Sequence, residues 1–194
     1  MKKANSQNKQ VKLLIDQVLD KYVNLESNSP ELPLKNVGWG VIWFDEFYNE
    51  NQFGDFTFVM SPKDIITLVD ESLRFTRKTF AYVTDCGNTY EVETGSLGDA
   101  NLIELHNALH KPFYILDDSL AWFIECHFEG SNFFAKRELM ASVIVLFGGA
   151  ELIYSRMLSS LDEYKAVRDV RLCEYDYLQN VFHKLQEIEG KVEN

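Results

Sequence analysis

The sequence predicts an α+β fold: a single domain with a mostly antiparallel sheet, helices inserted between the strands, and a helical C-terminal third. Short β-branched and aromatic runs alternate with helical periodicity up to about residue 135, and helical periodicity alone follows. The chain of 194 residues is 46% apolar and 25% charged, which is typical of one globular domain with a full core. No linker, repeat or low-complexity tract divides it.

The N-terminal part begins with a polar tail over residues 1–8, which we expect to be mobile. Apolar residues at spacings of three and four then predict a first helix over 11–22, and the prolines after it end that helix. Residues 37–44 read as a strand, in which Gly38 and Gly40 indicate a bulge or a close approach of neighbouring backbone. Residues 56–60 read as a second strand, and the two could pair as an antiparallel hairpin.

The clearest local signal is the run Ser61-Pro62-Lys63-Asp64, which has a capping hydroxyl, a proline at the first helical position and an acid in the first turn. It predicts a helix over 61–75. Strands over 79–83 and 89–93 follow, joined by a turn at 85–88. In the second strand Tyr90 and Val92 alternate with Glu91 and Glu93, so both glutamates are expected on one exposed face.

A short helix over 100–110 is predicted next, followed by strands over 112–116 and 121–128 around a turn at Asp117-Asp118. Beyond Gly130 the apolar spacing becomes helical, starting from Phe133 and continuing to a helix end at Gly148-Gly149.

Residues 150–188 are predicted to be helical with a break near Ser159-Ser160. The last apolar stripe is expected to pack lengthwise on a partner element; it comprises Leu172, Tyr175, Leu178, Phe182, Leu185 and Ile188. The chain thus divides into a tail (1–8), an α/β core part (9–135) and a helical part (131–190).

The net charge of −11 is concentrated in the middle of the chain, since residues 37–135 carry five Lys/Arg against sixteen Asp/Glu. Such a surface repels phosphate, which argues against direct binding of nucleic acid or an anionic membrane and favours a basic protein partner. Three cysteines without paired spacing indicate neither a disulfide framework nor a zinc motif. With no signal-peptide pattern and no apolar run long enough for a membrane helix, a cytoplasmic protein is expected.

No catalytic fingerprint, metal site or cofactor motif is predicted. His106 and His110 share the spacing of metal-binding histidines, but no third ligand is visible and partly exposed helix histidines are the simpler interpretation. Cys126 and His127 are adjacent on a strand and point to opposite faces, so Cys126 is expected to be a small buried apolar residue. The histidines and Cys126 are therefore not assigned a chemical role.

These observations favour an acidic interaction protein that is not an enzyme, of the kind that neutralises a basic toxin such as a bacterial nuclease. The residues expected to bind the partner are acids of the middle region and two aromatic anchors: Asp85, Glu91, Glu93, Asp99, Asp117, Asp118, Tyr48 and Phe53. Two alternatives stay open: a nucleic-acid mimic that blocks a DNA-binding defence enzyme, and an enzyme whose site joins acidic and aromatic residues near Asp45, Glu46 and Glu125. Homo-oligomerisation through the C-terminal helix is a further possibility.

Overall fold

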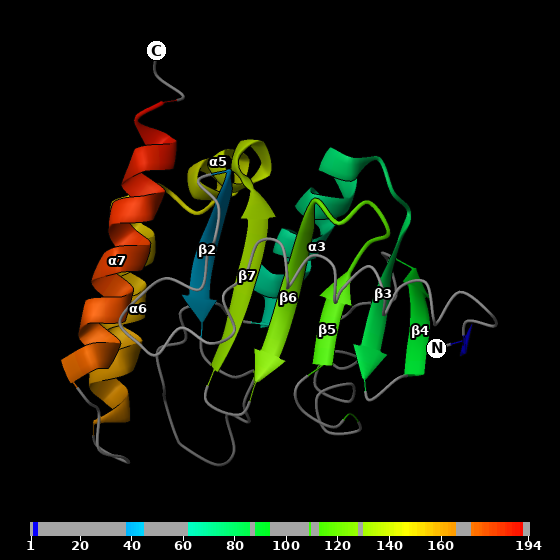
Figure 1. Ribbon diagram of the computed structural model, residues 1–194, viewed down its shortest axis with the longest axis horizontal. Helices are drawn as coiled ribbons and strands as arrows, with labels where there is room; N and C mark the ends of the chain where they lie inside the picture. The colour runs from blue at the N-terminus through cyan, green and yellow to red at the C-terminus, as the bar shows by residue number, and fades with distance from the viewer. Residues whose placement is uncertain are drawn as a thin grey trace.

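The computed structural model of the chain describes residues 2–3, 38–44, 62–85, 88–93, 109, 113–127, 130–165 and 172–191. The described strands form one antiparallel sheet in the order β1-β4-β3-β5-β6-β7-β2 (Figure 1). The strands are β1 (Lys2–Lys3), β2 (Trp39–Phe44), β3 (Phe80–Asp85), β4 (Asn88–Glu93), β5 (Phe113–Leu116), β6 (Trp122–His127) and β7 (Gly130–Lys136). The helices are α3 (Pro62–Thr76), α5 (Arg137–Leu146), α6 (Ala150–Tyr164) and α7 (Leu172–Glu189). The predicted α+β class is confirmed.

Strand β2 occupies one edge of the sheet and pairs with β7, which lies far along the chain. The predicted hairpin partner, 56–60, lies outside the described residues. The β2–β7 register is uninterrupted, so no bulge occurs there. The expected close approach of neighbouring backbone is not what surrounds Gly40: an added Cβ would lie 2.6 Å from Cγ of Met140 and 2.8 Å from Cδ1 of Ile188, which are both side-chain atoms. A larger residue at this position would therefore require the side chains of Met140 on α5 and Ile188 on α7 to shift.

The sheet has two faces, because directly opposed residues of antiparallel strands share a side. The helix face carries Ile115, Ile124, Phe133 and Ile42 in register across four strands. The second face carries Leu116, Phe123, Phe134 and Val41 in the same way. All eight side chains are at most 2% exposed, so the central strands are buried on both sides.

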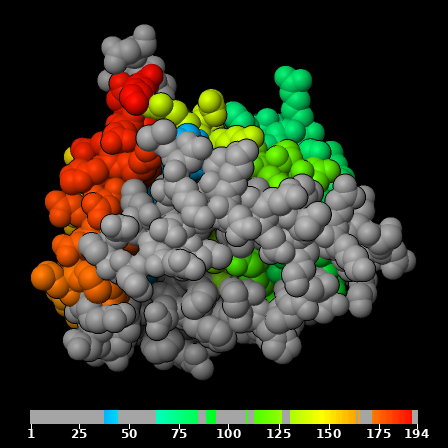
Figure 2. Space-filling view, in the orientation of Figure 1, coloured from blue at the N-terminus to red at the C-terminus, as the bar shows by residue number. Residues whose placement is uncertain are grey.

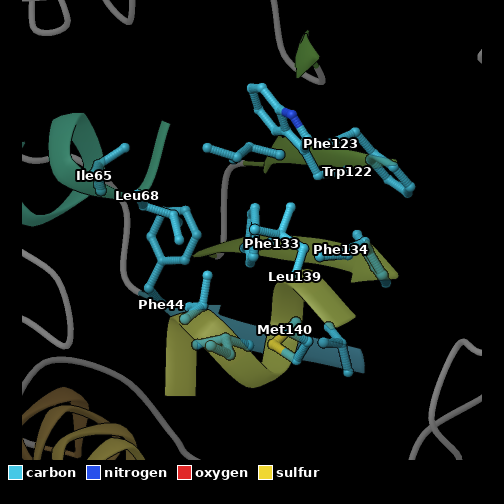
Figure 3. Packing of buried hydrophobic residues seen from close by; sticks show 14 of the residues in the cluster. Phe44, Ile65, Leu68, Trp122, Phe123, Phe133, Phe134, Leu139 and Met140 are labelled. Atoms are coloured by element: carbon cyan, nitrogen blue, oxygen red, sulfur yellow. The ribbon is translucent and has the colours of Figure 1, made fainter. Parts of the chain in front are cut away.

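Helices α3 and α5 cover the helix face. Ile65 and Leu68 of α3 lie near Phe44 of β2, and Met140 of α5 lies nearby (Figure 3). Helix α3 begins at Pro62, within the capping signal of the sequence. The spacing of its buried residues turns one apolar stripe toward the sheet. The predicted helix over 61–75 is therefore confirmed to within a residue.

Residues 130–136 form strand β7 and not the start of a helix, so the expected helical placement of Phe133 is wrong. Helix α5 begins only at Arg137. Phe133 and Phe134 point to opposite faces, and both are buried because β7 is a central strand. Strands buried on both faces lose the polar alternation that reveals a strand in sequence.

The predicted helix end at the glycine pair is confirmed. Gly148 and Gly149 have φ angles of 87° and 102°, and the amide of Gly149 donates to the carbonyl oxygen of Ile144 at 2.8 Å. The predicted break at Ser159-Ser160 is wrong, because α6 continues through both serines to Tyr164. Among the described residues no single helix has the length and apolarity to cross a membrane; α5 and α6 meet that test only together, bent by 76°.

Helix α7 packs lengthwise against α6 and beside β2, as predicted for the C-terminal stripe (Figure 1). Its buried residues are Leu178, Val181, Leu185 and Ile188, and Phe182 stacks on Tyr154 of α6 with ring centroids 4.4 Å apart. Leu172 differs from the prediction, since it is 78% exposed at the first turn. The outer face of α7 forms one side of the molecule (Figure 2).

Candidate functional site

The residues predicted to bind a partner lie in different parts of the chain, and the structure describes only some of them. Tyr48, Phe53 and Asp99 lie outside the described residues. Asp85 ends β3, where its backbone pairs with Asn88 of β4.

Glu91 and Glu93 are exposed on β4, as the alternation predicted. The register places them opposite Tyr82 and Phe80 of β3, so both glutamates belong to the second face. Tyr82 is buried, Phe80 is half-buried, and their rings meet edge to face at 5.4 Å. The two carboxylates thus border an aromatic pair.

Asp118 is exposed in the turn after β5 and forms an ion pair with Lys78. The pKa of the Tyr82 hydroxyl is raised, first by burial and then by the negative charges of Asp118 and Glu91, while Lys78 opposes the shift. Asp118 and Glu91 therefore act on the same hydroxyl from two different elements. We call Glu91, Glu93 and Asp118 the acidic edge.

The charge of the acidic edge is partly balanced. Bonding to Asp118 raises the pKa of Lys78, which keeps that ammonium charged beside the turn. The backbone of β1 pairs with β4 beside these acids, with Lys2 at the register position of Glu91. The carboxylates of Glu91 and Glu93 stay exposed at this end of the sheet.

The prediction that Asp117 lies on the exposed surface is wrong, since its side chain is fully buried. Its Oδ2 accepts hydrogen bonds from Thr76 Oγ1 at 2.6 Å and from Trp122 Nε1 at 2.9 Å. Its Oδ1 accepts from the backbone amide of Ser119 at 2.7 Å and from the Ser119 hydroxyl. Four donors make Asp117 a structural carboxylate that ties α3 to the β5–β6 turn.

A row of polar and aromatic side chains crosses the second face next to the buried apolar row. The register places these residues at successive positions from β4 to β2, and we call them the polar row: Thr89, Thr84, Tyr114, Glu125, Asn132 and Trp43. Thr84 and Thr89 are buried, with their hydroxyl oxygens 2.9 Å apart. The other four are half-buried.

Two tyrosine hydroxyls donate hydrogen bonds to half-buried residues of the polar row. The Tyr114 hydroxyl donates to Oε1 of Glu125 at 3.3 Å, and the Tyr177 hydroxyl of α7 donates to Oδ1 of Asn132 at 3.2 Å. Burial and the charge of Glu125 both raise the pKa of Tyr177 far above its usual range, which keeps it a protonated donor. One carboxylate, one amide, two phenols and one indole are therefore brought together from five elements.

Sequence reasoning singled out Glu125 only among the acidic and aromatic residues of an alternative enzyme site, and it did not find the polar row. The sequence signal for the polar row is a single polar residue inside an otherwise apolar strand. Tyr114 in β5 and Glu125 in β6 are such residues, and the register places them opposite each other. Asp45 and Glu46 lie outside the described residues, so the structure does not relate them to Glu125.

Of the candidate thiol and metal-binding residues, the structure describes Cys126 but not the two histidines. Cys126 is completely buried on the helix face, as expected for a small apolar residue. His106 and His110 lie outside the described residues. Within the described parts of the chain, no group of three His, Cys, Asp or Glu side chains has an arrangement that could hold a metal ion.

Comparison with known proteins gives no relative from which a site could be transferred. No family model, curated protein or solved structure matches the chain.

Proposed function

We propose that the protein is an acidic inhibitor, of the immunity or antitoxin kind, that binds and neutralises a basic protein such as a nuclease toxin. The observation that carries the proposal is the acidic edge. Glu91 and Glu93 are exposed on β4, and Asp118 acts with Glu91 on the hydroxyl of Tyr82. A nuclease surface is basic because it binds phosphates, so its field and that of the acidic edge are complementary.

The physical consequence is kinetic. Exposed carboxylates gain little from a static ion pair in water, but complementary fields can raise association rates about 10- to 1,000-fold. That steering is screened beyond a Debye length of about 10 Å at 0.1 M salt. Binding should therefore depend on the acidic edge mainly through the association rate, most strongly at low salt.

The test is affinity capture from the source cell, followed by kinetics with the captured protein. The Glu91→Lys/Glu93→Lys variant should lose the captured basic protein, or associate with it at least about tenfold more slowly at low salt. A matched control, Glu151→Lys/Asp176→Lys, makes the same change in net charge on exposed positions of α6 and α7. The control should retain the wild-type association rate to within about twofold, because its acids lie outside the acidic edge.

Three results would contradict this function. One is capture of no basic protein; another is equal slowing by both double variants; the third is an association rate that does not change with salt. Displacement of the captured protein by double-stranded DNA would instead favour the alternative, a nucleic-acid mimic acting on a DNA-binding enzyme.

A further inference from the structure

The outer edge of strand β4 is paired with a very short strand. Within the described chain only β1 pairs with this side of β4, at the end of the sheet opposite to β2 (Figure 1). β1 consists of two residues, Lys2 and Lys3, which pair with Glu91 and Tyr90. Unpaired backbone groups at a sheet edge are a template for another strand, and a two-residue strand covers few of them.

The backbone groups that β4 presents at this edge follow from its hairpin with β3. Two residues join the strands, and Asp85 and Asn88 close the hairpin as a register pair. The closing pair of such a hairpin is hydrogen-bonded, and bonded pairs alternate along the ladder. The backbone N–H and C=O groups of Thr89, Glu91 and Glu93 therefore point away from β3, toward the outer edge. Those of Glu93 lie beyond the positions with which β1 pairs.

The charge at this edge suits a basic strand. Glu91 and Glu93 are exposed and lie two positions apart, so they share one face of β4. Neither carboxylate forms an ion pair in the described chain. The strand that pairs here is itself made of two lysines, so the chain already places basic residues at this edge. A longer strand with Lys or Arg at alternate positions would set one basic residue opposite each glutamate.

We propose that β1 holds the place of an extended basic segment of the partner, and that this segment displaces β1 and adds to β4 as an antiparallel edge strand. Strand addition gains affinity from main-chain hydrogen bonds and specificity from alternate side chains. The inference rests on the proposed function and names the contact that follows attraction by the acidic edge. The partner segment should carry Lys or Arg two residues apart, opposite Glu91 and Glu93.

The test uses the whole protein and a defined probe, the peptide acetyl-Val-Lys-Val-Lys-Val-Thr-amide. NMR follows the chemical shifts and hydrogen exchange of the Glu91 and Glu93 backbone amides. We expect saturable shifts, and slower exchange at Glu93 because its N–H gains an acceptor. The matched control is the same peptide N-methylated at both lysine amides, which keeps the charge and removes the donors that face β4. It should bind at least about tenfold more weakly, since two hydrogen bonds are lost.

Variants of β1 test the displacement. Lys2→Pro/Lys3→Pro removes the backbone donors of β1, because proline has no N–H. The peptide should then bind at least about threefold more tightly, because the competing strand no longer occupies the edge. Lys165→Gln/Lys191→Gln removes the same charge from exposed positions outside the sheet, and its affinity should equal that of the wild type to within about twofold. An unchanged Trp122 indole resonance establishes that each variant is folded.

Three results would overturn the inference: equal binding of the two peptides, unchanged exchange at Glu93 in the saturated complex, and no gain in Lys2→Pro/Lys3→Pro over Lys165→Gln/Lys191→Gln. Its failure is distinguishable from failure of the proposed function. Slower association of the captured protein with Glu91→Lys/Glu93→Lys, without strand addition by the peptide, leaves the inhibitor function standing and removes this contact. Strand addition in a protein that captures no basic partner does the reverse.

Discussion

Replacing Asp117 by alanine tests the finding that this acid is structural. The carboxylate receives hydrogen bonds from Thr76, Trp122 and Ser119, and the variant removes the acceptor for all of them at once. Hydrogen bonds to a charged group contribute about 1.5–3 kcal/mol each, and a donor left buried without an acceptor costs about 1–3 kcal/mol. The total depends on which donors can find a substitute.

The donors are unequal in this respect. Thr76 Oγ1 also lies 3.0 Å from the carbonyl oxygen of Ser72, so it has a second acceptor in its own helix. Ser119 is exposed and can bond to water. Trp122 is 0% exposed, so its indole N–H loses an acceptor that water does not replace. We therefore expect Asp117→Ala to lower the free energy of unfolding by about 3 kcal/mol, most of it from Trp122.

Urea denaturation followed by tryptophan fluorescence measures the effect. With a slope of about 2 kcal/mol per molar urea, a loss of about 3 kcal/mol lowers the midpoint by about 1.5 M. Asp118→Asn is the control, since Asp118 is the exposed neighbour in the same turn and its ion pair with Lys78 is open to solvent. If Asp117→Ala unfolds within about 0.3 M urea of Asp118→Asn, the carboxylate does not hold the turn and the reasoning is wrong.

Two further variants test the packing of the sheet and the burial of a helix acid. Gly40→Ala should lower the free energy of unfolding by about 1–3 kcal/mol in urea denaturation, because its Cβ would overlap Met140 and Ile188; a neutral result would mean that α5 and α7 yield. Asp70 of α3 has a pKa raised above 3.8 by burial, an effect that the charge of Arg74 opposes. Because the folded state binds that proton more tightly, its stability falls as pH rises through the raised pKa. Asp70→Asn should therefore gain in urea midpoint relative to wild type between roughly pH 4 and pH 7, and a constant difference would contradict this.

Local signals in the sequence were sufficient where the decisive contacts are local. The capping run at Pro62 gave α3, the glycine pair at Gly148 ended α5, and alternation in β4 placed Glu91 and Glu93 on the surface. Each of these features depends on residues within one turn of helix or one strand.

The failures have long-range causes. Asp117 stands in a turn, where acids are usually exposed, and it is buried because Thr76 from a distant helix donates to it. Ser160 is 3% exposed within α6, so tertiary packing carries the helix through a position of weak helical preference. Trp43 could not be placed in the polar row from the sequence, because it joins the row through the β2–β7 pairing, which sets it opposite Asn132 across nearly half of the chain.

The carboxylates of the sheet differ in exposure, and exposure decides what each one can do. Buried Asp117 has its four hydrogen bonds and serves the fold. Exposed Glu91 and Glu93 act through a field that reaches about 10 Å and that salt screens, so in the proposed complex they set the association rate. Added salt should then mimic Glu91→Lys/Glu93→Lys: it should slow association and leave the dissociation rate unchanged.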